Sequence, residues 1–268
     1  MTAPGSTPAS SAGEPFPAPV GEGAADTLTA TFLQACGHQL GAGSLVPAVL
    51  ARAAVQVLPV DAGGLSTLTH GLRLPLGATT LAAEVAEELQ TTLGEGPCLR
   101  AAEARTGCVA DLAELQRSWP LYAEELTRRT PYRSAVSIPL SGPTGEIFAA
   151  LDLYAEDSKL SDRLDVQQVT RDVGEPLGAL LEVCLRPLRA LDDGQQDDEQ
   201  PLPEWYDDVT LRRHTVWVAI GMVRSQCHRP VHDALSALRG HAYSRDRSLD
   251  DVAADIVHRR MQVDDLDL

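Results

Sequence analysis

The sequence lacks the long apolar segments that would place it in a membrane. No apolar run reaches the roughly 18 residues that a spanning helix needs. The first thirty residues are rich in Ala, Pro, Ser and Gly, and they contain neither the basic nor the apolar region of a signal peptide. We therefore expect a soluble, cytoplasmic protein without a membrane partner.

The cysteines lack the patterns of a disulfide framework or a zinc site. The chain has five, an odd number, and no two are arranged as CxxC. They are Cys36, Cys98, Cys108, Cys184 and Cys227. This pattern predicts reduced thiols and a fold that is built without metal.

Positive charge is scarce and comes almost wholly from arginine. The formal net charge is −16 and the sequence pI is about 4.7, whereas nonspecific attraction to phosphates scales with the local density of Lys and Arg. Lys159 is the only lysine, and arginine is the better residue for bidentate contacts to phosphates or bases. Genome base composition could produce the same bias. Any nucleic-acid site must therefore be local and built from arginine.

Two stretches of biased composition divide the chain. Residues 1–26 repeat Pro, Gly and Ser without aliphatic periodicity, so they cannot repay the entropy of ordering and predict a disordered arm. Residues 189–204, acidic and rich in Gln and Pro, predict a linker. We expect a larger unit over residues 27–188, a smaller tail unit over residues 205–262, and an acidic end at residues 263–268.

The larger unit mixes helical and strand patterns. Apolar residues at steps of four predict an amphipathic helix within residues 44–59, and helical stretches also cover residues 80–93 and 119–129. Short runs bounded by turn residues predict strands at residues 63–69, 134–140 and 146–155. The order of helix, two strands, helix, two strands and helix predicts an α+β fold, with helices packed against an antiparallel sheet.

A final helix of the larger unit is predicted over roughly residues 161–188. Its apolar stripe consists of Val166, Val169, Val173, Leu177, Leu180 and Cys184. The stripe could seal the sheet or pair with a second subunit. Pro176 within the segment predicts a kink or a restart.

The tail unit is helical in pattern throughout. Its first segment, LRRHTVWVAIGMV at residues 211–223, offers Val216, Trp217, Ile220 and Val223 for packing. Apolar faces within residues 231–242 and 249–260 predict a second and a third helix, the third beginning at Ser248. We therefore expect an all-α unit of three helices.

Motifs in both units resemble known families. In the larger unit, ELQTTLGEGPCLRAAEARTGCVADL, WPLYAEEL, RSAVSIPL and GEIFAALDLYA resemble the GAF domains of bacterial sensor proteins. In the tail unit, RRHTVWVAIGMV, DALSALRGHA and SLDDVAADIV resemble an ANTAR domain, a three-helix RNA-binding module. The order is that of GAF and ANTAR transcription antitermination regulators of actinobacterial type. In the ANTAR family the domain acts as a dimer, binds paired hairpins in a nascent transcript and prevents terminator formation.

The resemblance implies RNA contacts in the tail unit. Arg213 matches the family's arginine eight positions before the glycine of the first helix, and Arg239 matches the arginine that follows leucine in the second. RNA recognition needs cations for phosphates and planar groups that stack on unpaired bases. These needs extend the candidate site to Arg212, His241, Tyr243, Arg245 and Arg247. The alternative is that the arginines form surface ion pairs with Asp208, Asp246 or Asp250.

Three positions of the tail unit depart from the family pattern. Ile220 stands where lysine usually precedes the first-helix glycine, and Asp246 and Ser248 stand where Asn and Lys are common. Residues 204–263 contain nine arginines and eight acids, so the unit is almost uncharged. We expect weak, salt-sensitive RNA affinity, which dimerisation could increase through avidity.

Other side chains of the tail unit allow more than one interpretation. Acidification could add positive charge through its five histidines, which lack the spacing of a metal site. These are His214, His228, His232, His241 and His258. Trp217 is interpreted as a core or dimer-interface residue and not as a base-stacking platform.

Cys98 is the candidate sensing residue of the larger unit. In the turn LGEGPC, Pro97 suits the first helical position, and Cys98 would then lie in the first turn, where the helix dipole favours a thiolate. A ligand- or redox-sensing role is one interpretation, and a small buried hydrophobic residue is the other. Methionine sulfoxide reductases built on a GAF scaffold carry a similar turn, but they use further cysteines, and Glu88 occupies the first of those positions.

Enzymatic and cofactor signatures are missing elsewhere. There is no HD or HExxH pair, no phosphate-binding Gly-rich loop followed by lysine, and no set of nucleophile and base. A haem-binding GAF domain needs an axial histidine, and His38 and His70 are expected on the surface of a peripheral helix and in a turn. We therefore expect no catalytic residues, no metal and no cofactor.

These observations give one hypothesis and one alternative. The hypothesis is a homodimeric antiterminator whose GAF-like unit senses a small-molecule ligand, a redox change or a partner, and whose tail unit binds hairpin RNA. The alternative is a regulator whose helical tail dimerises or docks on a protein partner without binding RNA.

Overall fold

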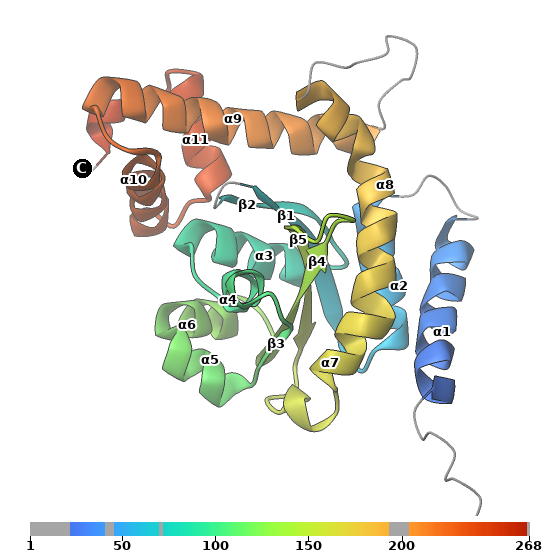
Figure 1. The fold of residues 1–268 in the computed structure, drawn as a ribbon. Coiled ribbons are helices and arrows are strands. Elements are labelled where there is room, and N and C mark those ends of the chain that lie inside the picture. Colours follow the sequence, from blue (N-terminus) through green and yellow to red (C-terminus); the bar gives the residue numbers. More distant parts are fainter. Residues whose placement is uncertain (1–21, 41–45, 70–71, 193–203, 267–268) are drawn as a thin grey trace, which may run out of the picture.

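The computed structural model describes residues 22–40, 46–69, 72–192 and 204–266. In this part of the chain a five-stranded antiparallel sheet, with strand order β2-β1-β5-β4-β3, is followed by C-terminal helices (Figure 1). The strands are β1 Ala62–Thr69, β2 Leu72–Ala78, β3 Cys108–Ala110, β4 Ser134–Ser141 and β5 Ile147–Ala155. The predicted α+β class is confirmed. The sequence pattern assigned no residues to β2 or β3, and the three residues of β3 are too few to show an alternating pattern.

One face of the sheet is apolar. Alternation along β5 turns Leu151 and Leu153 to this face. Helices α2 Pro47–Val57 and α8 Glu175–Asp192 pack on it, and α1 Glu22–Leu40 packs outside α2 (Figure 1). These layers form the main hydrophobic core of the protein.

The opposite face of the sheet carries polar as well as apolar side chains. It is covered by α3 Leu81–Leu93, α4 Pro97–Ala104, α5 Leu112–Ser118 and α6 Pro120–Arg129. Pro75 lies in the edge strand β2, where a missing N–H group is tolerated. Thr80 caps α3 by accepting a hydrogen bond from the backbone N–H of Ala83.

The segment after the sheet is interrupted, as Pro176 predicted. It consists of the 3₁₀ turn η1 Leu160–Asp162, α7 Val166–Val169, the π-helical turn η2 Thr170–Gly174 and then α8. Val169, Val173 and Leu177 are buried on the apolar face of the sheet. The apolar stripe was predicted either to cover the sheet or to pair with a second subunit. In the structure it covers the sheet.

The C-terminal part is a helical unit with its own core, and the three predicted helices are confirmed. They are α9 Glu204–Cys227, α10 Val231–Ser244 and α11 Leu249–Val257, followed by the 3₁₀ turn η3 Val263–Asp265. Val216, Ile220 and Val223 are buried as predicted, and Trp217 is half-buried against the same core. Val263 and Leu266 join this core, which therefore continues past residue 262.

We call residues 22–192 the sheet unit and residues 204–266 the tail unit. Residues 1–21 of the predicted arm and residues 193–203 of the predicted linker lie outside the described residues. The predicted bounds were too wide, because residues 22–26 belong to α1, residues 189–192 to α8 and residue 204 to α9. Among the described residues, no helix has both the length and the apolar character that crossing a membrane requires.

Candidate functional site

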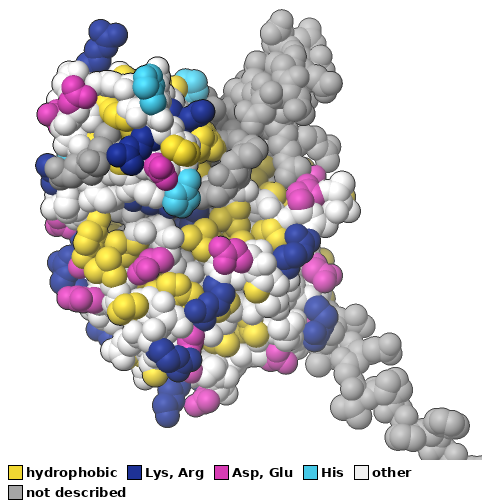
Figure 2. Space-filling model, turned by 60° about the vertical axis from the view of Figure 1, so that its left-hand side comes forward, with side chains coloured by type: hydrophobic (Ala, Val, Ile, Leu, Met, Phe, Trp, Pro, Cys, Tyr) yellow, Lys and Arg dark blue, Asp and Glu magenta, His cyan; other side chains and the backbone are white. Residues whose placement is uncertain are grey.

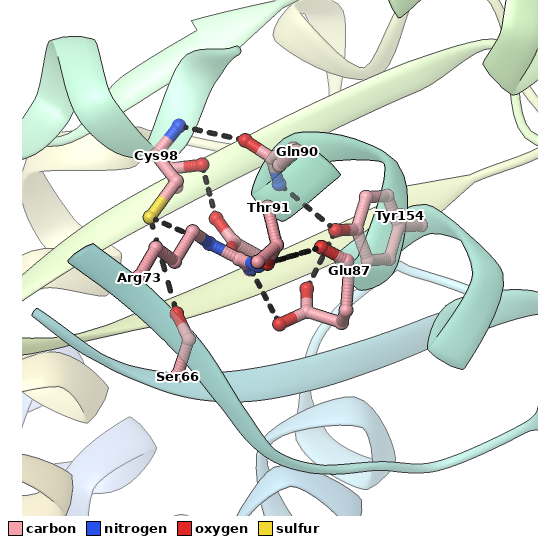
Figure 3. A network of polar contacts seen from close by, with 9 residues as sticks. Ser66, Arg73, Glu87, Gln90, Thr91, Cys98 and Tyr154 are labelled. Atoms are coloured by element: carbon pink, nitrogen blue, oxygen red, sulfur yellow. Dashed lines mark hydrogen bonds and ion pairs between the residues drawn. The ribbon is translucent and has the colours of Figure 1, made fainter. Parts of the chain in front are cut away.

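A fully buried arginine lies at the centre of the polar face of the sheet. Arg73 comes from β2, and its side chain is enclosed between the sheet and α3 (Figure 3). Its Nε donates to Cys98 Sγ at 3.3 Å, and Nη1 donates to the Glu87 carbonyl at 2.7 Å and to Thr91 Oγ1 at 3.1 Å. Nη2 donates to Glu87 Oε2 at 2.5 Å and to Asp152 Oδ2 at 2.6 Å. All five N–H groups of the guanidinium are therefore used.

Two buried carboxylates complete this centre, and each has further partners. Ser137 on β4 donates to Asp152 Oδ1, and Tyr154 on β5 donates to Glu87 Oε1 at 2.6 Å. The side chain of Gln90 donates to the Tyr154 hydroxyl at 3.1 Å. Such a network is stabilising only when its polar groups are satisfied, and these contacts satisfy most of them.

The charges of the centre do not cancel when both carboxyl groups are ionised. Burial raises the pKa of Glu87 from 4.5 to about 7, although Arg73 opposes the shift. Burial alone would lower the pKa of Arg73, but the neighbouring carboxylates raise it well above its ordinary value. Near neutral pH, Glu87 can therefore gain or lose a proton while Arg73 stays charged.

Cys98 belongs to this centre, and its surroundings correct one expectation. Pro97 begins α4 and Cys98 follows in the first turn, as predicted. The side chain is completely buried, and burial raises the pKa of its thiol, so the expected stabilisation of a thiolate by the helix dipole is outweighed. Cys98 is thus small and buried, but it lies in a polar centre and belongs to none of the hydrophobic clusters. Its additional role is to accept the hydrogen bond from Arg73.

The site residues predicted from the sequence do not include Arg73, Glu87 or Asp152. A signal was present, because Arg73 and Asp152 each interrupt an apolar strand run, in LRLPL and ALDLY. Charges inside such runs are costly to bury unless they are paired. The pairing could not be assigned from the sequence, since Asp152 lies 79 positions from Arg73.

The tail unit packs directly on the sheet unit. Leu72 and Leu74 of β2 belong to the hydrophobic core of the tail unit, next to α9. Helix α10 contacts α3, and the backbone N–H of Leu249 donates to Thr92 Oγ1 at 3.4 Å. Arg129 of α6 forms an ion pair with Asp246. The interface thus combines apolar, hydrogen-bonded and ionic contacts.

Two of the predicted RNA-binding residues lie in or near this interface. Arg239 is partly buried, and its Nε donates to the carbonyl of Thr91 at 3.0 Å. His241 is buried in α10, with 4% of its surface exposed. Thr91 accepts hydrogen bonds from both arginines, Arg73 at its hydroxyl and Arg239 at its carbonyl.

The other predicted RNA-binding residues have different surroundings. Arg212 is exposed and interacts electrostatically with Asp250. Arg245 and Tyr243 are exposed, whereas Arg247 forms an ion pair with Asp255. Arg213 lies in α9, but its side chain is outside the described residues. Of these positions, the structure brings Tyr243 and Arg247 together in the lining of one pocket beside α3.

The three departures from the ANTAR pattern each have a structural role here. Ile220 is buried in the core of the tail unit, where a lysine ammonium would lack water. Asp246 pairs with Arg129 across the interface. Ser248 caps α11 by accepting a hydrogen bond from the backbone N–H of Asp251 at 2.9 Å.

Several hollows border the tail unit, including one of about 210 Å³ that is lined by Arg129, Tyr243 and Arg247. A cavity of about 400 Å³ between the units is lined by Glu87 and Thr91 of α3 and by Arg212, Asp250 and Asp251 of the tail unit, among others. An open groove of about 560 Å³ follows the turn from α9 to α10 and is lined by Arg224, His228 and Arg229. Among the described residues, neither arginine of this groove forms an ion pair.

One face of the molecule is mixed in charge (Figure 2). Figure 2 shows acidic and basic side chains interspersed on this face, with histidines on the upper lobe, which the tail unit forms. Within the part of the chain that the structure describes, no group of three or more His, Cys, Asp or Glu side chains could hold a metal ion. His38 lies exposed on α1, as predicted, and His70 is outside the described residues.

The fold belongs to the class of α+β proteins in which helices cover both faces of an antiparallel sheet. No protein-family model matches the chain, and no curated protein sequence matches it.

Solved structures with a similar arrangement include two GAF domains. The GAF domain of nlh2 from A. aeolicus, in an inactive state, is 11% identical, with a TM-score of 0.42, over 58% of this chain and 98% of that one. The GAF domain of a phosphoenolpyruvate-protein phosphotransferase from Coxiella burnetii is 16% identical, with a TM-score of 0.44, over 63% and 99%.

A third similar structure is an enzyme. The type II free methionine-R-sulfoxide reductase from Thermoplasma acidophilum is 14% identical, with a TM-score of 0.35, over 59% of this chain and 94% of that one. At TM-scores below 0.5, these likenesses do not define a family for this chain.

Proposed function

We propose that this protein is a signal-responsive RNA-binding regulator without enzymatic activity. The sheet unit, which resembles GAF domains in its motifs, is the sensor. The tail unit, which resembles an ANTAR domain, binds hairpins in nascent transcripts as a dimer and so acts in antitermination.

The observation that carries the proposal is the double role of Thr91. Its hydroxyl accepts a hydrogen bond from Arg73 in the buried charge centre, and its carbonyl accepts one from Arg239 in the tail unit. A change of charge or packing at the centre therefore acts on an element that also holds a predicted RNA contact. This is the arrangement that a sensor and its output require, namely two sites that bias one shared element.

A salt titration of the full-length protein against a two-hairpin RNA tests the proposal. Phosphate contacts give an affinity that falls steeply as salt rises. We expect Arg213→Ala to weaken binding by about tenfold and to reduce the slope of log affinity against log salt by about one. Arg117→Ala is the control, because Arg117 is exposed on α5 and pairs with Glu114 away from the tail unit. Equal affinities of both variants and the unmodified protein would refute the role of Arg213.

A second candidate function is a tail that binds protein and not RNA. It is favoured by the burial of Arg239 and His241 and by the nearly balanced charge of the tail unit. It predicts no hairpin binding at any salt concentration, so the same titration separates the two functions.

A further inference from the structure

Arg239 has an unusual position for a cation. Its Nε donates to the backbone carbonyl of Thr91 at 3.0 Å, and its Nη1 lies over Gly94, where an added Cβ would come within 2.5 Å of it. No carboxylate among the described residues pairs with it, and its buried Nη2 has no hydrogen-bond partner. Burial consequently lowers the pKa of Arg239. A mostly buried guanidinium held by one carbonyl is poorly compensated.

A phosphate group would satisfy the hydrogen-bond donors of Arg239 better than the end of α3 does. A guanidinium matches the geometry of phosphate oxygens and can form two charge-assisted hydrogen bonds with them. While the guanidinium is packed on the end of α3, its Nε donates to the Thr91 carbonyl and its Nη2 is buried, so neither group can donate to an RNA phosphate. The two arrangements are therefore mutually exclusive.

Contacts that do not involve Arg239 itself hold the tail unit against the end of α3. Arg129 pairs with Asp246, and Leu249 donates to Thr92. Leu72 and Leu74 add apolar contact with α9. These contacts keep Arg239 on α3 although its own interactions there are weak.

We infer that the sheet unit and RNA compete for Arg239, so that the end of α3 is an inhibitory docking surface and the arrangement described here is the closed state. The inference rests on the proposed function. In a closed state the apparent affinity for RNA falls in proportion to the fraction of open molecules. Changes on the sheet unit alone should therefore strengthen RNA binding.

Arg129→Glu tests this without touching the tail unit. It removes the ion pair with Asp246 and replaces it by repulsion. Arg117→Glu is a matched control, because it makes the same charge change on the neighbouring helix α5. Each substitution also removes an ion pair with a glutamate, and in each case that glutamate still pairs with a second arginine. Glu125 still pairs with Arg128, and Glu114 still pairs with Arg100.

The two variants give opposite results if the inference holds. Both variants make an acidic protein more negative. Repulsion of the RNA phosphates by this charge alone would leave the affinity of each variant for the two-hairpin RNA equal or weaker. We expect Arg129→Glu instead to bind about three- to tenfold more tightly than the unmodified full-length protein, through a larger open fraction. Arg117→Glu should show no gain.

Gly94→Ala tests the packing of Arg239 on the end of α3 without a change of charge. The new methyl group would occupy the space of the Arg239 guanidinium, which must move away. Gly94 has φ of +69°, so Gly145→Ala, at φ of +85° with no atom within 4 Å of its Cβ, controls for backbone strain. We expect tighter RNA binding by Gly94→Ala and an unchanged affinity for Gly145→Ala.

Failure of the inference differs from failure of the proposed function. If the unmodified protein binds the hairpin RNA and neither Arg129→Glu nor Gly94→Ala binds it more tightly, the competition is refuted and RNA binding stands. If no form of the protein binds the RNA, the proposed function is refuted and the inference with it.

Discussion

Replacement of Glu87 by glutamine tests the charge centre most directly. Glu87→Gln keeps the size of the side chain and an oxygen for Arg73, and it removes the group that burial makes hard to ionise. The excess negative charge of the centre is removed with it. The variant should therefore lose a pH dependence of stability that the unmodified protein has.

The size of the effect follows from the pKa of Glu87. Folding raises it from 4.5 to about 7, so the folded protein retains a proton that the unfolded chain releases. Stability from this group is complete below pH 4.5 and is lost as the pH rises to about 7. The whole shift corresponds to about 3 kcal/mol, of which about 2.5 kcal/mol falls between about pH 5 and about pH 8.

Denaturant unfolding followed by circular dichroism measures this loss. The free energy of unfolding of the unmodified protein should fall by about 2.5 kcal/mol relative to that of Glu87→Gln between about pH 5 and about pH 8. Glu103→Gln, at an exposed position on α4, should follow the unmodified protein. A constant difference between the unmodified protein and Glu87→Gln across this range would refute the reasoning.

Two further predictions concern Cys98 and the groove at the turn from α9 to α10. Because Cys98 is fully buried and burial raises the pKa of its thiol, iodoacetamide should label it much more slowly than the half-buried Cys227, as measured by peptide mass spectrometry. Comparable labelling rates would contradict the burial argument. Under the proposed function, Arg224→Ala combined with Arg229→Ala should reduce the salt slope of hairpin binding by about two. An unchanged slope would exclude the groove from the RNA contact surface.

Local structure was largely predictable because its causes are local. Apolar spacing identified α2, α3 and the three helices of the tail unit, and the position of Ser248 identified the start of α11. Pro176 marked the interruption before α8. Each signal lies within a few residues of the feature that it predicts.

The interaction partners of individual charged side chains were not predictable in the same way. Arg239 was expected to face RNA, and in the structure it donates to a carbonyl 148 positions away. Asp246 was one of the expected partners of the tail arginines, and its partner is Arg129 of the sheet unit. Surface electrostatics depends on which units meet, and a residue's own neighbours in sequence carry little information about that.

By itself, the sequence determined most of the helices, three of the five strands, the α+β class and a helical tail, because hydrophobic periodicity, caps and breakers act over a few residues. Only the tertiary structure decided that Arg73, Glu87 and Asp152 form one buried centre and that the tail unit covers the end of α3. The physical reason is burial. Segments that are distant in sequence remove water from a charged side chain only when the chain folds. That desolvation makes the charge energetically costly, can shift its pKa toward neutral pH and can make it inaccessible to a ligand.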